Sequence, residues 1–159
     1  MNLQSRVWIY QSNRALRNEE LILIKERLSS FISSWTAHNQ ALKAAFEIRY
    51  DRFLVLIVDE TQAGASGCSI DKSVHLMKDI EQQFHINLFD RLNMAWKMDE
   101  QVHSSSKEDF EELLKQGKIS SETIVFNNLV SDYEQYLHHW EIPFKDSWHA
   151  KVFKLESIL

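Results

Sequence analysis

The sequence FEIRYDRFLVLIVDE, residues 46–60, decides the fold class of this chain. Hydrophobic and charged residues alternate over residues 46–50, which predicts a half-exposed strand. Residues 53–58 contain no polar side chain, which is typical of a central strand that is covered on both faces. Asp51 and Arg52 separate the two segments, and we therefore expect an antiparallel hairpin.

Helical hydrophobic periodicity flanks this hairpin on both sides. After the hairpin, one face of a predicted helix carries Ile70, Val74, Met77, Ile80 and Phe84. Before the hairpin, a second predicted helix carries Leu21, Ile24, Leu28, Phe31, Ile32 and Trp35 on one face. Ile22 and Leu23 fall off that face, and they are available to a second surface or to a partner.

The remaining elements are shorter. We expect strands near residues 6–11, 92–97 and 123–126. Capping boxes at Ser106 and Ser131 predict two further helices. The order β-α-β-β-α-β-α-β-α predicts one α+β domain over residues 1–159, with a mixed or mostly antiparallel sheet of about five strands and about four helices.

Composition excludes several classes of protein. The 159 residues carry 18 basic and 23 acidic side chains, a net charge of −5, without a basic run that would favour nucleic-acid binding. The hydrophobic fraction of 44% is enough for a packed core. No hydrophobic run approaches the ~20 residues that span a bilayer, and residues 1–6 lack the hydrophobic core of a secretion signal. We expect a soluble cytoplasmic protein without a membrane partner.

The segment GASGC, residues 64–68, holds two of the three glycines and the only cysteine. It lies between the predicted central strand and the start of the next helix. Glycine-rich strand-to-helix junctions let a backbone approach a ligand, and they expose helix amides. The junction at residues 59–72 is therefore our candidate site.

Cys68 has two interpretations at this position. A thiol at a helix N-terminus lies near the exposed amides and the positive end of the helix dipole, which favour a reactive thiolate. A free cysteine can also be a small buried side chain that fits beside Gly67. A single cysteine excludes an internal disulfide and is compatible with a reducing compartment.

The same loop can instead bind an anion. Gly64 and Gly67 would permit close approach, Ser66 and Ser69 would donate hydrogen bonds, and Lys72 would supply positive charge. The alternative is ordinary capping of the helix by Ser66 or Ser69. The loop does not match the phosphate-binding pattern of P-loop enzymes or the nucleophile elbow of hydrolases.

Asp59 and Glu60 end the predicted central strand. Two carboxylates at a strand end can hold Mg²⁺ or act as a base, and Asp71 or Asp90 could join them. This is the basis of a metal-dependent hydrolase hypothesis; solvated charges that close a strand are the alternative. The C-terminal histidines lack a third ligand at a useful spacing, so we predict no metal site and no cofactor.

Five segments together resemble a small bacterial family whose members often carry the label "ABC transporter ATPase". They are VWIYQ (7–11), WTAH (35–38), DET through GCSID (59–71), FNNLV (126–130) and PFKDSWH (143–149). The resemblance spans almost the whole chain, and it implies no particular activity, cofactor or catalytic residue. The phosphate-binding loop and the ABC signature loop are missing, so we do not expect ATP hydrolysis.

Three functional hypotheses follow. The first is a small-molecule or anion site at residues 59–72, with Cys68 as a nucleophile. The second is a non-catalytic interaction or homo-oligomeric assembly module, based on Ile22, Leu23 and the C-terminal aromatic residues Trp140, Phe144 and Trp148. The third is a metal-dependent hydrolase that uses Asp59 and Glu60.

Overall fold

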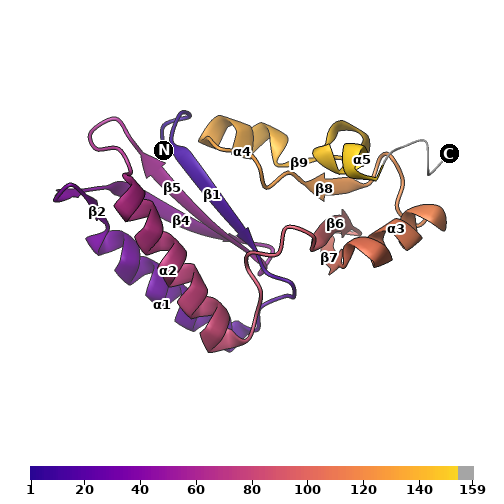
Figure 1. Cartoon of the computed structure of the whole chain (residues 1–159), viewed down its shortest axis with the longest axis horizontal. Helices are drawn as coiled ribbons and strands as arrows, with labels where there is room; N and C mark the ends of the chain where they lie inside the picture. The colour runs from indigo at the N-terminus through magenta and orange to yellow at the C-terminus, as the bar shows by residue number, and fades with distance from the viewer. Residues whose placement is uncertain (154–159) are drawn as a thin grey trace.

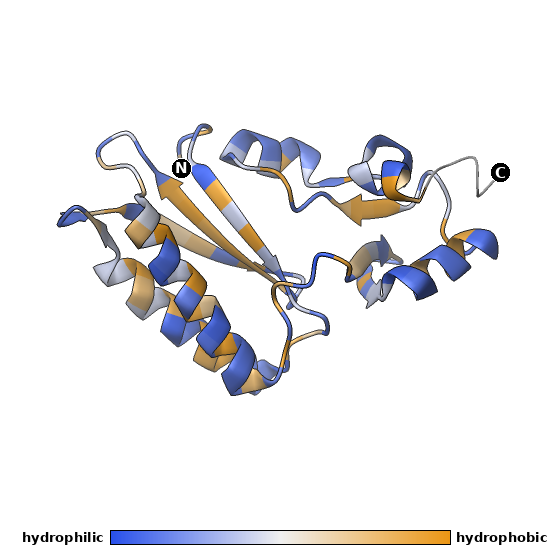
Figure 2. Cartoon of the chain, viewed as in Figure 1, coloured by the Kyte–Doolittle hydropathy of each residue, from blue (hydrophilic) through white to orange (hydrophobic). Residues whose placement is uncertain are grey.

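A three-stranded antiparallel sheet forms the first part of the molecule. In this computed structural model, which describes residues 1–153, β5 (Phe53–Asp59) lies between β1 (Arg6–Gln11) and β4 (Lys43–Arg49). All seven residues of β5 are buried, and Figure 2 shows the hydrophobic character of this strand. The hairpin and the covered central strand predicted from residues 46–58 are confirmed.

Two long helices cover one face of this sheet (Figure 1). They are α1 (Asn18–Ser34) and α2 (Gly67–Phe84). Most of the predicted hydrophobic positions face β5, and Leu28, Met77 and Ile80 are completely buried there. In α2 the prediction is wrong for Ile70 and Val74, which are half-buried, because Ser69, Ser73 and Leu76 take the buried positions instead. Ile22 and Leu23 are exposed, as their position off the helix face predicted.

A four-stranded antiparallel sheet, in the order β7-β6-β8-β9, forms the second part. Its strands are β6 (Met94–Met98), β7 (Gln101–Ser105), β8 (Ile124–Phe126) and β9 (Glu141–Pro143). The sequence did not predict strand β7, which lies in the polar segment 101–106. The sequence QVHSS alternates weakly, and pairing with the buried strand β6 decides its conformation.

The remaining helices pack around the second sheet. They are α3 (Lys107–Lys115), α4 (Tyr133–His139), the 3-10 turn η1 (Phe144–Asp146) and α5 (Trp148–Val152). Ser106 caps α3 as predicted, because its hydroxyl accepts a hydrogen bond from the Asp109 amide. The cap of α4 is Asp132 rather than Ser131, since the Asp132 carboxylate accepts the Gln135 amide.

An aromatic cluster joins the two sheets. Phe53, Phe126 and Trp140 lie with ring centroids 4.7–5.0 Å apart, on the face of the first sheet that the long helices leave free. Trp140 and Phe144 are each 1% exposed. The prediction that they form an interface is therefore wrong, because the second half of the chain buries them in its own core.

The described residues thus form an α+β domain, as predicted from the order of elements. The described residues contain more strands than the five expected. Short strands such as β2 (Thr36–Ala37) and β3 (Gln40–Ala41) were missed because two residues are too few to show the alternation that predicts a strand. Within residues 1–153, every helix is too short or too polar to cross a bilayer.

Candidate functional site

The hairpin β2–β3 lies beside the beginning of α2. Its turn consists of His38 (φ 51°) and Asn39 (φ 64°), both in the left-handed region that two-residue hairpins require. Trp35, directly before the hairpin, is 2% exposed, and its indole Nε1 donates to the Ser69 carbonyl at 2.8 Å. This buried hydrogen bond attaches the base of the hairpin to the first turn of α2.

A groove of about 580 Å³ lies between the hairpin and the helix. It is lined by Thr36, His38, Asn39, Ser66, Gly67, Cys68 and Lys72. None of these side chains is acidic, and α2 has no acidic residue in its first turn. The lining therefore combines the positive end of the helix dipole with one lysine, which favours a negatively charged occupant.

The first turn of α2 is closed by a reciprocal cap. The Ser69 amide donates to Ser66 Oγ at 3.1 Å, and the Ser66 amide donates to Ser69 Oγ at 2.7 Å. The amides of Gly67 and Cys68 have no acceptor among residues 1–153, as expected of the first positions of a helix. The capping interpretation of the two serines is correct, and two backbone donors stay available at the groove.

Cys68 is exposed. The interpretation as a small buried side chain is therefore wrong for this thiol, because α2 turns its second residue outward while Ser69 turns inward and is 1% exposed. Lys72 follows one turn later and lines the same groove. His38 reaches the groove from the hairpin, so an imidazole and the thiol share one lining.

Other residues of the predicted site lie elsewhere. Ser69 is buried and its hydroxyl belongs to the cap. Gly64 does not line the groove: an added Cβ there would lie 3.1 Å from Glu60 Oε2. Gly67 has open space around an added Cβ and no positive φ, so neither contact nor backbone conformation requires glycine there.

Asp59 and Glu60 each make internal contacts. Asp59 is 5% exposed and accepts hydrogen bonds from Thr61 Oγ1 (2.7 Å) and the Thr61 amide (3.0 Å). These bonds, together with Lys43 Nζ at 3.4 Å, lower the pKa of Asp59. Glu60 accepts the Ala65 amide at 2.8 Å and lies 3.9 Å from Arg6. The two carboxylates therefore stabilise the strand end and the loop that follows it.

Metal-ligating side chains do not gather in the part of the chain that the structure describes. Within residues 1–153, no group of three or more His, Cys, Asp and Glu side chains could hold a metal ion. His149 is 3% exposed, and burial lowers its pKa to about 4. Its Nδ1 lies 3.1 Å from Ser147 Oγ, so this histidine is part of the C-terminal core.

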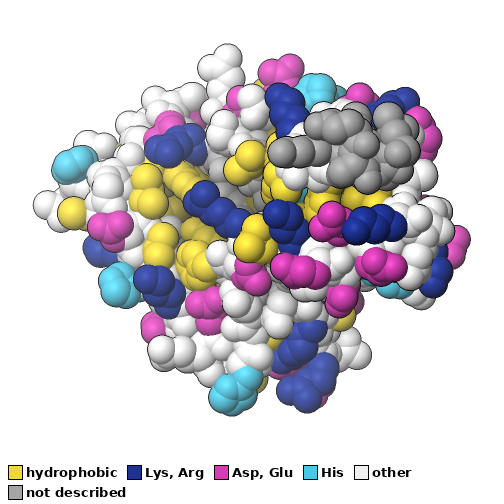
Figure 3. All heavy atoms as spheres, turned by 45° about the vertical axis from the view of Figure 1, so that its right-hand side comes forward, with side chains coloured by type: hydrophobic (Ala, Val, Ile, Leu, Met, Phe, Trp, Pro, Cys, Tyr) yellow, Lys and Arg dark blue, Asp and Glu magenta, His cyan; other side chains and the backbone are white. Residues whose placement is uncertain are grey.

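A second polar cluster connects the two sheets. The Arg49 guanidinium lies 5.1 Å from the Trp140 ring centroid, and its Nη1 donates to Tyr136 Oη at 3.0 Å. Glu47 and Glu141 lie within 4.0 Å of Arg49 and balance its charge. Figure 3 shows a face on which Lys and Arg side chains lie beside acidic and hydrophobic ones. Paired charges of this kind hold the sheets together.

Sequence reasoning missed Thr36, His38 and Asn39 as residues of the groove. They lie about 30 positions before Cys68, and the two-residue strands that position them carry no periodic signal. The pair His38-Asn39 is the one weak sequence signal for the hairpin turn. Asparagine and histidine adopt the left-handed conformation more readily than most residues do. Comparison of the chain with protein-family models, curated proteins and solved structures gave no match.

Proposed function

We propose that the groove between the β2–β3 hairpin and α2 binds a small anionic molecule and that Cys68 is a reactive thiol in it. The observation that carries this proposal is the shared lining: an exposed thiol, a lysine, an imidazole and two free helix amides, without an acidic side chain. Each of these groups stabilises negative charge in a ligand or in the thiolate.

The residues have separate roles in this proposal. The amides of Gly67 and Cys68 donate to the anion, and Lys72 contributes its charge from the next turn of the helix. His38 can accept the thiol proton when Cys68 attacks an electrophile, since both line one groove. Ser66 contributes indirectly, because its cap fixes the first turn of α2.

The single cysteine makes a direct test practical. The rates of alkylation by anionic iodoacetate and neutral iodoacetamide are measured for the folded protein and for free cysteine. A positive groove raises the iodoacetate-to-iodoacetamide rate ratio above that of free cysteine. We expect Lys72→Ala to lower the ratio several-fold and inorganic phosphate to slow both reactions.

Lys78→Ala is the matched control, because Lys78 is exposed on the same helix and does not line the groove. It should leave the ratio and the phosphate protection unchanged. The proposal fails if the wild-type ratio equals that of free cysteine and phosphate gives no protection. It also fails if Lys72→Ala and Lys78→Ala change the ratio equally.

Assembly through α1 is a second proposal, supported by the exposure of Ile22 (60%) and Leu23 (44%). The C-terminal aromatic residues no longer support it, because Trp140 and Phe144 are buried. Light scattering tests the proposal: a dimer that Ile22→Ser or Leu23→Ser dissociates would support it, and a monomer at high concentration would contradict it.

The metal-dependent hydrolase stays a hypothesis with little support, since the contacts of Asp59 and Glu60 are internal. A rise in melting temperature with Mg²⁺ or Mn²⁺ would revive it. Membership of the family often labelled "ABC transporter ATPase" stays a proposal based on the segments quoted above. The absence of ATP hydrolysis stays a prediction that a direct assay can check.

A further inference from the structure

Among residues 1–153, Arg52 is a buried arginine without an acidic partner. It lies in the hairpin between β4 and β5, and the residue is 7% exposed. The arginines at positions 6, 14, 17, 27 and 49 each have a carboxylate within 4.0 Å, and Arg91 is exposed. Within residues 1–153, no carboxylate lies within 4.0 Å of Arg52. A desolvated cation without a counter-charge is costly, which calls for a compensating group.

One side of the Arg52 guanidinium is used and the other is free. Its Nη1 donates to Ser104 Oγ at 2.6 Å, and Ser104 Oγ donates in turn to the Asn13 carbonyl at 3.1 Å. The Nε atom is buried and has no hydrogen-bond partner among the described residues. Nε and Nη2 form the second donor pair of the planar fork, which matches two oxygens of a carboxylate or a phosphate.

A second unpaired donor belongs to the same junction of strands. The Arg52 carbonyl accepts the Ser12 amide at 2.9 Å, where β1 ends and β5 begins. The preceding residue, Gln11, donates through Nε2 to the Asn93 carbonyl at 2.7 Å. Asn93 Nδ2 is buried and has no acceptor among residues 1–153. Figure 1 shows the end of β1, the β4–β5 turn and the segment that enters β6 meeting in this region.

Buried donors in native proteins are almost always paired. The unpaired Nε of a guanidinium that has no carboxylate within 4.0 Å among residues 1–153 therefore indicates an acceptor with negative charge. Burial also lowers the pKa of Arg52, although a guanidinium stays protonated at neutral pH. A hydrophobic residue would fill this position at less cost. A role in binding an anion explains why this buried position holds an arginine.

We propose that Arg52 binds an oxyanion, a carboxylate or phosphate group, through the Nε–Nη2 side of its guanidinium. This site is separate from the Cys68 groove and does not depend on the proposed function. The anion, either free or carried by a small molecule, neutralises the buried charge where the two sheets meet.

The test measures melting temperature and a local NMR signal in the Lys72→Ala background, in which anion binding at the Cys68 groove is weakened. Inorganic phosphate, acetate and chloride are compared at equal ionic strength. We expect an oxyanion at about ten times its Kd to raise the melting temperature by about 3 °C, and chloride to have a smaller effect. A larger melting shift with phosphate would indicate a phosphate-bearing ligand, and a larger shift with acetate would indicate a ligand with a carboxylate.

Arg52→Gln should abolish the difference between the oxyanions and chloride. Arg49→Gln is the matched control, because Arg49 lies in the same hairpin and has carboxylate partners; it should keep the difference. If Arg52→Gln does not fold, the ¹H–¹⁵N signal of the Arg52 Nε–H group in the Lys72→Ala protein decides. A signal that shifts with the oxyanion at saturable occupancy supports the proposal. A signal that does not move overturns it, as does an equal melting shift in the Arg52→Gln and Arg49→Gln proteins.

Discussion

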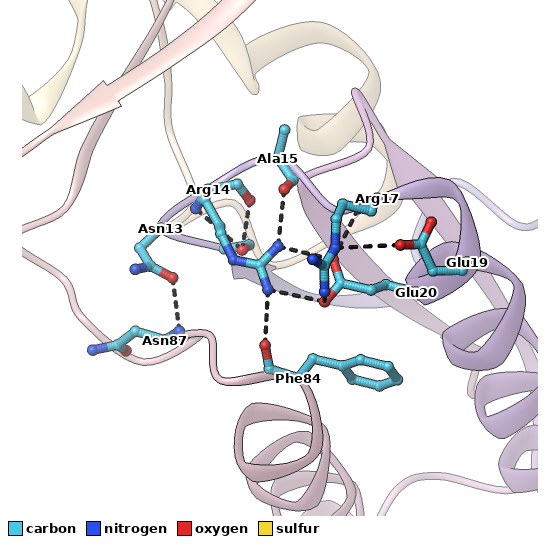
Figure 4. Close-up of polar contacts among 9 residues, drawn as sticks. Asn13, Arg14, Ala15, Arg17, Glu19, Glu20, Phe84 and Asn87 are labelled. Atoms are coloured by element: carbon cyan, nitrogen blue, oxygen red, sulfur yellow. Dashed lines mark hydrogen bonds and ion pairs between the residues drawn. The ribbon is translucent and has the colours of Figure 1, made fainter.

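Arg14, which is half-buried, and Glu20, which is buried, form a two-point ion pair that connects the two long helices. Arg14 Nη1 lies 2.8 Å from Glu20 Oε1, and Nη2 lies 2.9 Å from Oε2. Arg14 also donates to the Phe84 carbonyl at the end of α2, while Glu20 accepts the Arg17 amide at the start of α1 (Figure 4). This pair therefore supplies an acceptor for a free amide at the start of α1 and a donor for a free carbonyl at the end of α2.

Acid should weaken the protein through Glu20. The hydrogen bonds from Arg14 hold its pKa at about 2, against 4.5 for a free side chain. The lowered pKa contributes stability above pH 4.5, which is lost as the pH falls toward 2. The full contribution is on the order of 3 kcal/mol. We expect Glu20→Gln to remove most of it at pH 7 in urea unfolding.

Glu19→Gln is the control for this prediction, because Glu19 is exposed and lies 3.5 Å from Arg17 on the surface. Its unfolding free energy should change by less than about 1 kcal/mol. Equal losses in the two variants would show that the Arg14–Glu20 pair contributes no more than a surface pair does.

His149 should make the protein less stable between pH 6.5 and pH 4. Burial lowers its pKa from 6.5 to about 4, so the folded state disfavours the charged imidazole. The unfolded chain binds the proton first, and the stability lost on acidification is on the order of 3 kcal/mol. His149→Gln should flatten the dependence of unfolding free energy on pH in this range. His138→Gln, at an exposed position, should leave it intact.

Replacing Gly67 should stabilise the protein. An added Cβ meets nothing within 4 Å, and the backbone conformation suits an L residue. Gly67→Ala should raise the unfolding free energy by about 0.4–1 kcal/mol, because alanine reduces the entropy of the unfolded chain. Gly117 has φ +74°, so Gly117→Ala should lower it by about 1 kcal/mol. Thermal unfolding of the two variants should move in opposite directions; the same direction would contradict this explanation.

Asn128 connects the first strand to the aromatic cluster. Its Oδ1 accepts Trp140 Nε1 at 2.9 Å, and its Nδ2 donates to Gln11 Oε1 at 2.8 Å. Asn128→Ala leaves two buried partners unpaired and should cost about 2–4 kcal/mol in chemical denaturation. The neighbouring variant Leu129→Ala, at a position 66% exposed, should change stability by less than about 0.5 kcal/mol. A small loss for Asn128→Ala would mean that solvent pairs the exposed groups.

Local patterns were sufficient to predict most of the fold. The run Phe53–Val58, the two amphipathic helices and the Ser106 cap each depend on residues that are close together in the sequence. The strands β2, β3, β7 and β9 were missed because partners distant in sequence decide their conformation.

The sequence by itself determined that residues 46–60 form a hairpin with a covered strand, and that Cys68 lies in the first turn of a helix. These properties follow from periodicity and capping, which act over a few residues. Only the tertiary structure decided that Cys68 is exposed in a groove that His38 also lines, and that Trp140 is buried. It also decided that Arg52 is enclosed without an acidic partner among residues 1–153. Burial and charge pairing depend on which distant segments meet, and no local pattern records those contacts.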